Sequence, residues 1–209
     1  MSANDAMTST RYADATLAAY RRHAGRAIGN WGRLKRPSRF LRQFAGRLRP
    51  GARVLDYGCG VGTDLAWLRA RGFRVEGLDG TEAFVEAAKR RNPGVAVRCQ
   101  RFEHLQLPER AFDGIWCNAA LIHVPPSELA RQIAGLRRSL IAGGWLGLSL
   151  AWGRVKTYTA NDWIPGRYIA GYSKAEAAGF FDGWRIEELR VVSHDGRQGR
   201  WIQLLATHG

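Results

Sequence analysis

The sequence predicts an α/β protein whose mostly parallel sheet carries helices on both faces, and three observations support this fold class. Strand-like apolar runs alternate with helix-like segments from Val54 to Trp152. Short turns separate these segments, which is typical of crossover connections in a parallel sheet. The last two strand-like runs flank the turn-rich segment HDGRQG at 194–199, which predicts an antiparallel hairpin.

Seven segments have the apolar and β-branched character of strands, and helical segments lie between them. The predicted strands are 54–58, 73–79, 95–99, 112–118, 145–152, 184–193 and 199–208. The predicted helices in this region are 63–71, 81–91, 126–142 and 173–181. Gly143-Gly144 is expected to end the third of these helices, and residues 153–172 are expected to form a loop rich in aromatic residues and glycine.

The N-terminal part is predicted to be helical. Apolar residues recur every three or four positions across 11–34, and Gly25 and Gly29 weaken this stretch, so we expect a break near them. A second helix is predicted to begin after Ser38, which has the properties of an N-cap.

One domain with an N-terminal extension is the simplest organisation, because the sequence contains no repeat, low-complexity tract or linker. Residues 1–10 are polar and are expected to form a disordered leader. The expected domain is 11–209, divided into 11–50, a core at 51–150 and a C-terminal part at 151–209.

The charge is strongly basic and concentrated in one segment. The formal net charge is +14, and residues 11–53 hold eleven arginines and one lysine against the single acid Asp14, a balance of +11. Such a segment either docks an acidic partner, such as a nucleic acid or a carrier protein, or is a solvated helix face. Since no nucleic-acid-binding signature accompanies it, we favour the solvated face.

Cysteine usage and hydropathy place the protein in the cytoplasm. Cys59, Cys99 and Cys117 are odd in number and lack the spacing of a disulfide framework or a zinc site. No apolar run reaches the ~20 residues of a membrane span, and the N-terminus has no apolar signal core. We therefore expect no membrane association and no metal; the oligomeric state stays open.

The stretch VLDYGCGVGTD at 54–64 carries the main chemical signal. Gly58, Gly60 and Gly62 lie where a strand meets a helix, and glycine there permits a sharp turn and close approach of a ligand. The dinucleotide pattern G-x-G-x-x-G would place its third glycine at position 63, which is Thr63. Asp56 precedes the turn and would repel a pyrophosphate, so this turn suits a ligand with a positive group.

With these residues the chain resembles the class I S-adenosylmethionine-dependent methyltransferases, of the small bacterial methyltransferase-domain type. Four segments match the family's motifs in order across about 50–150. They are VLDYGCGVGTDL, VEGLDGTEAFVEAAKRR, LPERAFDGIWCNAALIHVP and LRRSLIAGGWLGLSL. The resemblance implies a Rossmann-like, seven-stranded, mostly parallel sheet with an antiparallel C-terminal strand, an N-terminal helical lid and S-adenosyl-L-methionine as cofactor.

The resemblance also implies roles for individual residues in binding the cofactor. Asp56 and the three glycines would shape the pocket for its methionine part, Asp79 would hydrogen-bond the ribose, and the simpler role of Asp79 is a helix N-cap. Gly80 would let the cofactor close on Asp79, and Asn118 would lie beside the methyl group. The remaining implied contacts are Phe102 and Glu103 at the adenine and Tyr20 in the lid, where core packing is an equal alternative.

His123, in ALIHVPP just past the fourth strand, is the candidate catalytic base. The same histidine can instead be structural, and both interpretations stay open. The sequence at 118–121 is NAAL, where the Asn/Asp-Pro-Pro-Tyr motif of adenine- and glutamine-methylating enzymes would stand.

The segments outside the matched region are expected to choose the acceptor. Aromatic residues and arginines gather in the loop after the fifth strand, which predicts either an acceptor pocket or a small secondary core. The candidates are Trp152, Arg154, Tyr158, Trp163, Arg167 and Tyr168. We expect methylation of an oxygen or nitrogen of a small molecule, compatible with specialised metabolism; methylation of RNA, protein or a carrier-bound substrate on the basic segment is the alternative.

Overall fold

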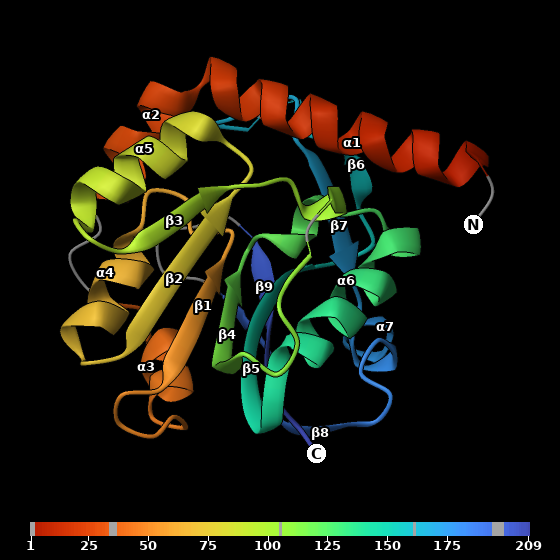
Figure 1. The fold of residues 1–209 in the computed structure, drawn as a ribbon. Coiled ribbons are helices and arrows are strands. Elements are labelled where there is room, and N and C mark those ends of the chain that lie inside the picture. The colour runs from red at the N-terminus through yellow and green to blue at the C-terminus, as the bar shows by residue number, and fades with distance from the viewer. Residues whose placement is uncertain (1–2, 34–36, 105, 161, 194–198) are drawn as a thin grey trace.

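The computed structural model describes residues 3–33, 37–104, 106–160, 162–193 and 199–209. Within these ranges one mixed sheet of nine strands forms the centre of the molecule, and helices cover both of its faces (Figure 1). Seven strands follow each other in the order β3-β2-β1-β4-β5-β9-β8. The predicted fold class is confirmed, including the parallel strands and the antiparallel C-terminal strand.

Four of the predicted strands lie within one residue of their predicted bounds, and a fifth, β5, begins earlier than predicted. Their bounds are β1 Arg53–Tyr57, β2 Arg74–Asp79, β3 Ala96–Cys99, β4 Phe112–Asn118 and β5 Leu140–Trp152. Asp56 pairs with Gly77 on one side and with Trp116 on the other, and Asn118 pairs with Ser149. The carboxyl ends of β1, β2 and β4 therefore meet at one edge of the sheet, where ligands bind in open α/β sheets.

The start of β5 differs from the prediction. The preceding helix ends at Ser139 instead of 142, and the chain enters the strand directly at Leu140. Gly143 and Gly144, predicted to end the helix, lie inside the strand, where the pairing register with β4 shifts between Phe112 and Gly114. Gly143 has φ +72°, so the glycine pair allows an irregularity in the strand.

The C-terminal hairpin strands are confirmed as β8 Trp184–Ser193 and β9 Arg200–His208, which pair antiparallel. The predicted turn between them falls at 194–199, and positions 194–198 lie outside the described residues. The segment 153–172, predicted as a loop, contains two short strands, β6 Lys156–Tyr158 and β7 Tyr168–Tyr172. They pair with each other, and β7 extends the sheet from the last two residues of β5.

Helices cover the two faces because β1 alternates its side chains between them. Val54 and Trp116 pack with Phe40 and Phe44 of α3, whereas Leu55 packs in the cluster that contains the apolar residues of α6. The helices of the core and C-terminal part are α4 Thr63–Ala70, α5 Glu82–Arg91, α6 Pro126–Ser139 and α7 Lys174–Gly179, with short 3₁₀ turns at Phe102–His104 and Leu121–His123.

The N-terminal part folds as three helices, α1 Ala3–Arg22, α2 Ala24–Gly32 and α3 Arg39–Ala45. The predicted break occurs at His23, and Ser38 caps α3 by accepting a hydrogen bond from the Leu41 amide at 3.0 Å, as predicted. Since α1 begins at Ala3, residues 3–10 are helical where the sequence predicts a disordered leader.

In Figure 1, α1 crosses the edge of the sheet toward which the arrowheads of β1 and β2 point. Two contacts fix it there: the Tyr168 amide donates to Thr16 Oγ1 at 3.0 Å, and Arg101 pairs with Asp14 at 2.7 Å. None of the helices that the structure describes combines the length and apolar character that a membrane span requires.

Replacing Gly62 with alanine is expected to lower the free energy of unfolding more than replacing Gly72. Both glycines have positive φ, +74° and +84°, and a side chain there costs about 1–2 kcal/mol. At Gly62 the new Cβ would also lie 2.6 Å from Nδ2 of the buried Asn92, whereas nothing lies within 4 Å at Gly72. Denaturant unfolding of the two variants measures the difference, and equal losses would contradict this packing.

Candidate active site

A cavity of about 1360 Å³ opens at the carboxyl ends of β1, β2 and β4, beneath the N-terminal helices. A pocket for one small ligand typically has roughly 300–1,000 Å³, so this cavity has room for two ligands side by side. Twelve of the seventeen predicted site residues line it. They are Tyr20, Asp56, Gly58, Gly60, Asp79, Gly80, Phe102, Glu103, Asn118, His123, Trp163 and Arg167.

The glycine turn between β1 and α4 forms one wall of the cavity. Gly58, Gly60 and Gly62 all have positive φ. A Cβ on Gly58 would lie 2.4 Å from the Ala120 Cβ, so the turn packs tightly against the segment that follows β4. At Gly60 the nearest atoms to a Cβ would be Trp31 ring carbons at 3.7 Å, which leaves space beside the backbone. Gly62 does not line the cavity; it packs against α5.

The carboxyl group of Asp56 is buried, and one of its two oxygens makes no hydrogen bond within the described part of the chain. The residue is 3% exposed, and Oδ2 has no hydrogen-bond partner among the described residues. Burial raises the pKa of Asp56 well above its usual range, and the nearby carboxylates of Asp64 and Asp79 raise it further. A buried acceptor facing a cavity in this way fits a ligand that brings a cationic N–H group.

Asp79, at the end of β2, is held by two backbone amides. Its Oδ1 accepts from the Thr81 amide at 2.8 Å, and its Oδ2 accepts from the Gly60 amide at 3.0 Å. Burial raises the pKa of Asp79 to about 6, while the two amide bonds act in the opposite direction. Thr81 occupies the N-cap position of α5, so Asp79 is not the N-cap of this helix.

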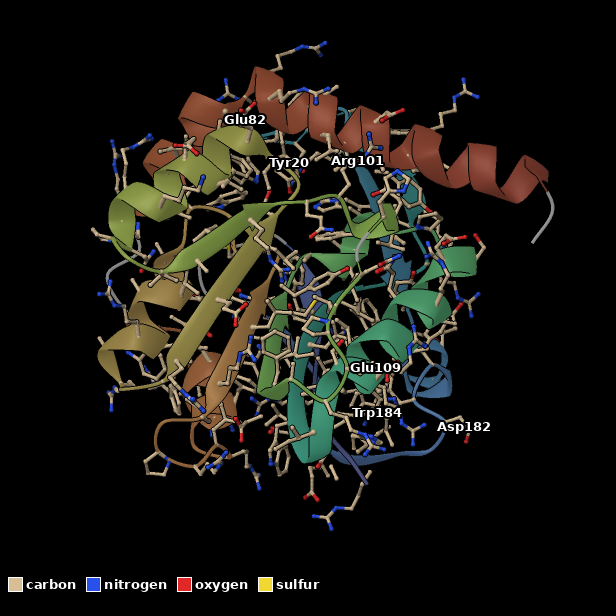
Figure 2. The ribbon with its side chains drawn as sticks, in the orientation of Figure 1. Tyr20, Glu82, Arg101, Glu109, Asp182 and Trp184 are labelled. Atoms are coloured by element: carbon tan, nitrogen blue, oxygen red, sulfur yellow. The ribbon has the colours of Figure 1, made fainter. Side chains whose placement is uncertain are left out.

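The segment after β3 lies beside Asp79. The Phe102 ring stacks on the Tyr57 ring with centroids 4.6 Å apart, and the Phe102 carbonyl accepts from Gln132 Nε2 at 3.1 Å. Glu103 accepts from Arg101 at 2.8 Å. In Figure 2, Tyr20 and Arg101 lie below α1, between this helix and the sheet.

Asn118 ends β4 within a network that includes an acid the sequence reasoning missed. Its Oδ1 accepts from Ser149 Oγ at 2.7 Å, and the same Oγ accepts from the Ala119 amide at 2.9 Å. Ala119 has φ +58°, an uncommon conformation for a residue with a side chain, and it lines the cavity. Asp64 accepts from Trp116 Nε1 at 2.8 Å. The position of Asp64 in the first turn of α4, directly after the sequence GVGT, is the signal from which its place in the site could have been predicted.

His123 is held by hydrogen bonds at both ring nitrogens. Its Nδ1 lies 2.7 Å from the Tyr168 carbonyl oxygen, so Nδ1 carries the proton and donates. Its Nε2, 2.8 Å from Tyr20 Oη, then accepts from the tyrosine hydroxyl. Burial lowers the pKa of His123 to about 4, and the positive charge of Arg167 lowers it further. The imidazole is therefore neutral at pH 7.

Arg167 continues this network but is not available as a free anion-binding group. It is 6% exposed, donates to Tyr20 Oη at 3.1 Å and to the Ile164 carbonyl at 3.0 Å, and forms an ion pair with Asp162. Its guanidinium thus links the segment before β7 to α1. Trp163 packs on Trp31 of α2 with centroids 5.4 Å apart, at the rim of the same region.

The other aromatic residues predicted for acceptor binding lie elsewhere. Trp152, Arg154, Tyr158 and Tyr168 do not line the cavity. Trp152 is 42% exposed and lies under the Arg200 guanidinium, and Tyr158 packs on Tyr12 and Tyr168. Tyr168 is buried in the main core. Of these four, Trp152 and Arg154 are exposed, and only Tyr158 and Tyr168 pack together, with Tyr12 of α1. The hairpin β8–β9 lines the cavity in their place through Arg190 and Gln203.

Comparison with known proteins shows what the chain is similar to. The family described as a methyltransferase domain matches residues 54–144. These residues form a methyltransferase domain, and the chain is similar to the class I S-adenosylmethionine-dependent methyltransferases. A thiopurine S-methyltransferase of Pseudomonas putida strain GB-1 is 29% identical over 184 residues, covering 78% of this chain and 82% of that protein.

Solved methyltransferase structures share the fold. The Burkholderia thailandensis 1,6-didemethyltoxoflavin-N1-methyltransferase, with 1,6-didemethyltoxoflavin and S-adenosylhomocysteine bound, has a TM-score of 0.74 at 20% identity, covering 96% of this chain and 90% of that one. The DhpI–S-adenosylhomocysteine complex has a TM-score of 0.72 at 22% identity, covering 95% of this chain and 97% of that one.

Both of these neighbours are in complex with S-adenosylhomocysteine. In this chain, the unsatisfied Oδ2 of Asp56 fits the ammonium group of such a cofactor. The chain spans 82% of the length of the thiopurine S-methyltransferase, but only 30%, 37% and 52% of the length of three other curated relatives that it matches.

Replacing Asp56 with asparagine is expected to stabilise the free protein while weakening cofactor binding. The amide keeps the size of the side chain but removes a buried charge beside two other carboxylates. Calorimetric titration with S-adenosylhomocysteine should show an affinity loss of about tenfold or more, the scale of one charge-assisted hydrogen bond. Thermal unfolding without ligand should show a higher midpoint at pH 7.5.

The pH dependence of the free energy of unfolding tests the same role of Asp56. Because the fold raises the pKa of Asp56, the native state binds its proton more tightly than the unfolded chain does. The free energy of unfolding should therefore fall as the pH rises above about 4, and it should fall less steeply in Asp56→Asn. A variant that is less stable at pH 7.5 and binds S-adenosylhomocysteine normally would contradict the assignment.

Proposed function

We propose that this enzyme transfers the methyl group of S-adenosylmethionine to an oxygen or nitrogen of a small-molecule acceptor. The observation that carries this proposal is the single cavity that places the Asp56–Asp79 pair and Asn118 against one continuous space large enough for a cofactor and a second small ligand. Bound S-adenosylmethionine supplies a methyl group already activated by its sulfonium, so the task left to the protein is to position the acceptor.

In this proposal each predicted cofactor residue has a defined task. Asp56 receives the ammonium group, and Asp79 accepts hydrogen bonds from the ribose hydroxyls. Phe102 and Glu103 border the adenine, and Asn118 lies beside the methyl group. The backbone at Gly58, Gly60 and Gly80 permits close approach of the ligand, whereas Gly62 supports the turn from behind. Tyr20 and Trp31 cover the cofactor from the side of the N-terminal helices.

The names of relatives support a small acceptor. One relative is named as a thiopurine S-methyltransferase, another as a ubiquinone biosynthesis O-methyltransferase, and one structural neighbour as a 1,6-didemethyltoxoflavin-N1-methyltransferase. The cavity agrees with a small acceptor because it is a pocket under the N-terminal helices.

Tyr20 and His123 form the proposed route for a proton that the acceptor loses. Tyr20 lines the cavity, and its Oη takes the acceptor proton while its own proton passes to His123 Nε2, 2.8 Å away. His123 is neutral, and its Nε2 has the lone pair to accept because the Tyr168 carbonyl holds the proton on Nδ1. Since its low pKa makes it a weak base, the two proton transfers occur together. Arg167 stabilises the negative charge that develops on the tyrosine oxygen. His123 therefore acts through Tyr20.

The basic N-terminal segment supports a second candidate, methylation of a macromolecule or carrier-bound substrate. Arg21, Arg22 and Arg26 are exposed on α1 and α2, outside the cavity. Docking on these arginines would make turnover strongly dependent on salt, because exposed charges are screened within about 8–10 Å at physiological ionic strength.

Methylation of a panel of small phenols and amines tests the proposed function. We expect S-adenosylhomocysteine to form with at least one member, and turnover to change little when the salt concentration rises severalfold. Asp79→Ala is the matched negative control, since loss of the ribose acceptor should abolish cofactor binding and turnover together. Turnover only with RNA or protein, and only at low salt, would favour the second candidate.

Tyr20→Phe and His123→Ala should each reduce turnover about 10²–10⁴-fold if the proton route is used. The buried Tyr172→Phe is the control, because its hydroxyl lies outside the cavity and has no hydrogen-bond partner among the described residues. Since His123 is the active base above its pKa of about 4, kcat should persist through pH 6.5 and decline only as the pH approaches 4. If turnover falls by less than tenfold in both variants, Tyr20 and His123 have a structural role only.

A further inference from the structure

A row of polar side chains crosses the sheet beneath the cavity, away from the glycine turn, and all of its members except the buried Ser149 line the cavity. The sheet register pairs Asn118 with Ser149, Ser149 with Gln203, and Gln203 with Arg190, across β4, β5, β9 and β8. Directly paired residues project to the same face of a sheet, so the four side chains form one continuous row. The row begins at the proposed methyl position and ends at Arg190.

Gln203 is the member of this row with hydrogen-bonding capacity to spare. Its Oε1 accepts from Arg190 Nε at 3.1 Å and from Nη2 at 3.0 Å, which assigns the oxygen end of the amide. Its NH₂ group has no acceptor among the described residues, and Gln203 lines the cavity. Arg190 also contacts Gln43 of α3 and Glu188, so it is held rigidly beneath the cavity.

Two further arginines line the same part of the cavity from the start of α3. Arg39 and Arg42 are exposed and form no ion pair with an acid of the described part of the chain. Arg42 Nη1 donates to the Pro37 carbonyl at 3.1 Å, which leaves its other guanidinium N–H groups for a ligand. Phe40 of α3, Trp67 of α4 and Trp201 of β9 also line the cavity. Phe40 and Trp67 belong to the apolar cluster of α3, and Trp201 lies two positions from Gln203, on the same face of β9. We call these walls and the Gln203–Arg190 floor the α3–hairpin arm.

The two parts of the cavity differ in charge. Asp56, Asp64 and Asp79 line the cavity around the glycine turn, and in the proposed function Asp56 receives the ammonium group of the cofactor. The α3–hairpin arm instead presents Arg39 and Arg42, together with donor groups from Gln203. Arg167, the arginine expected to bind an anion, is already paired with Asp162. Arginines that lack an acidic partner and lie beside aromatic side chains recognise planar anions such as carboxylates.

We infer that the α3–hairpin arm is the acceptor subsite and that the acceptor is a small aromatic or heteroaromatic acid. The ring lies over β5 and β9 between the aromatic walls, Gln203 donates to a polar ring substituent, and the acidic group points to Arg39 and Arg42. This inference rests on the proposed function, since it specifies the acceptor of that reaction.

Calorimetric titration of an acid and its neutral amide into protein saturated with S-adenosylhomocysteine tests the inference. The probes are 4-hydroxybenzoate and 4-hydroxybenzamide at pH 8, which share the ring and differ in charge. We expect the carboxylate to bind at least about tenfold more tightly, the scale of a charge-assisted hydrogen bond. The double variant Arg39→Ala/Arg42→Ala should lose this preference.

Arg21→Ala/Arg22→Ala is the matched control, because it removes the same charge from α1 outside the cavity and should keep the preference. Gln203→Glu should also weaken carboxylate binding, since it retains the acceptor for Arg190 and adds a negative charge to the floor. Equal binding of the two probes, no binding of the carboxylate, or a preference that survives Arg39→Ala/Arg42→Ala overturns the inference. Failure of S-adenosylhomocysteine itself to bind would contradict the proposed function instead.

Discussion

The buried carboxylate of Asp56 is the constraint on which the rest of the site depends. A charge at this depth is unfavourable unless a cation compensates it, and two further acids beside it increase the cost. The fold supports this arrangement with tight packing of the glycine turn against Ala120 and α5 and with backbone amides directed at Asp79. The free protein is thus electrostatically prepared for a cationic ligand before one arrives.

The central fold was predictable because its signals are local. Apolar runs of strand length, glycines at fixed spacing and an acid near the end of each of two strands determine β1, β2 and the turn between β1 and α4. The boundary at Leu140 was not predictable in this way, because Gly143-Gly144 signals a helix end as readily as an irregularity in a strand. Only the pairing of β5 with β4 decides between these structures.

The candidate site was predictable near the glycine motif and less so beyond it. Aromatic residues between 152 and 168 satisfy the composition of a binding loop, yet Tyr158 and Tyr168 pack on Tyr12 of α1. Whether an aromatic side chain meets solvent, ligand or core depends on which distant helix covers it, and sequence spacing does not encode this. Gln203 and Arg190 could not be predicted for the same reason, because only the register of the strands places them at the floor of the cavity.

Tyr20 and Gln203 line one cavity although 183 positions separate them in the chain. Segments from the N-terminal and C-terminal parts of the chain are therefore both needed to enclose this space, and Arg167 joins them by donating to Tyr20 Oη at 3.1 Å. Loss of the hairpin β8–β9 would remove Arg190 and Gln203 from the cavity and expose the edge of β5 that pairs with β9. The shape of the cavity is thus a property of the whole sheet, so a change in the hairpin can alter the space that α1 covers.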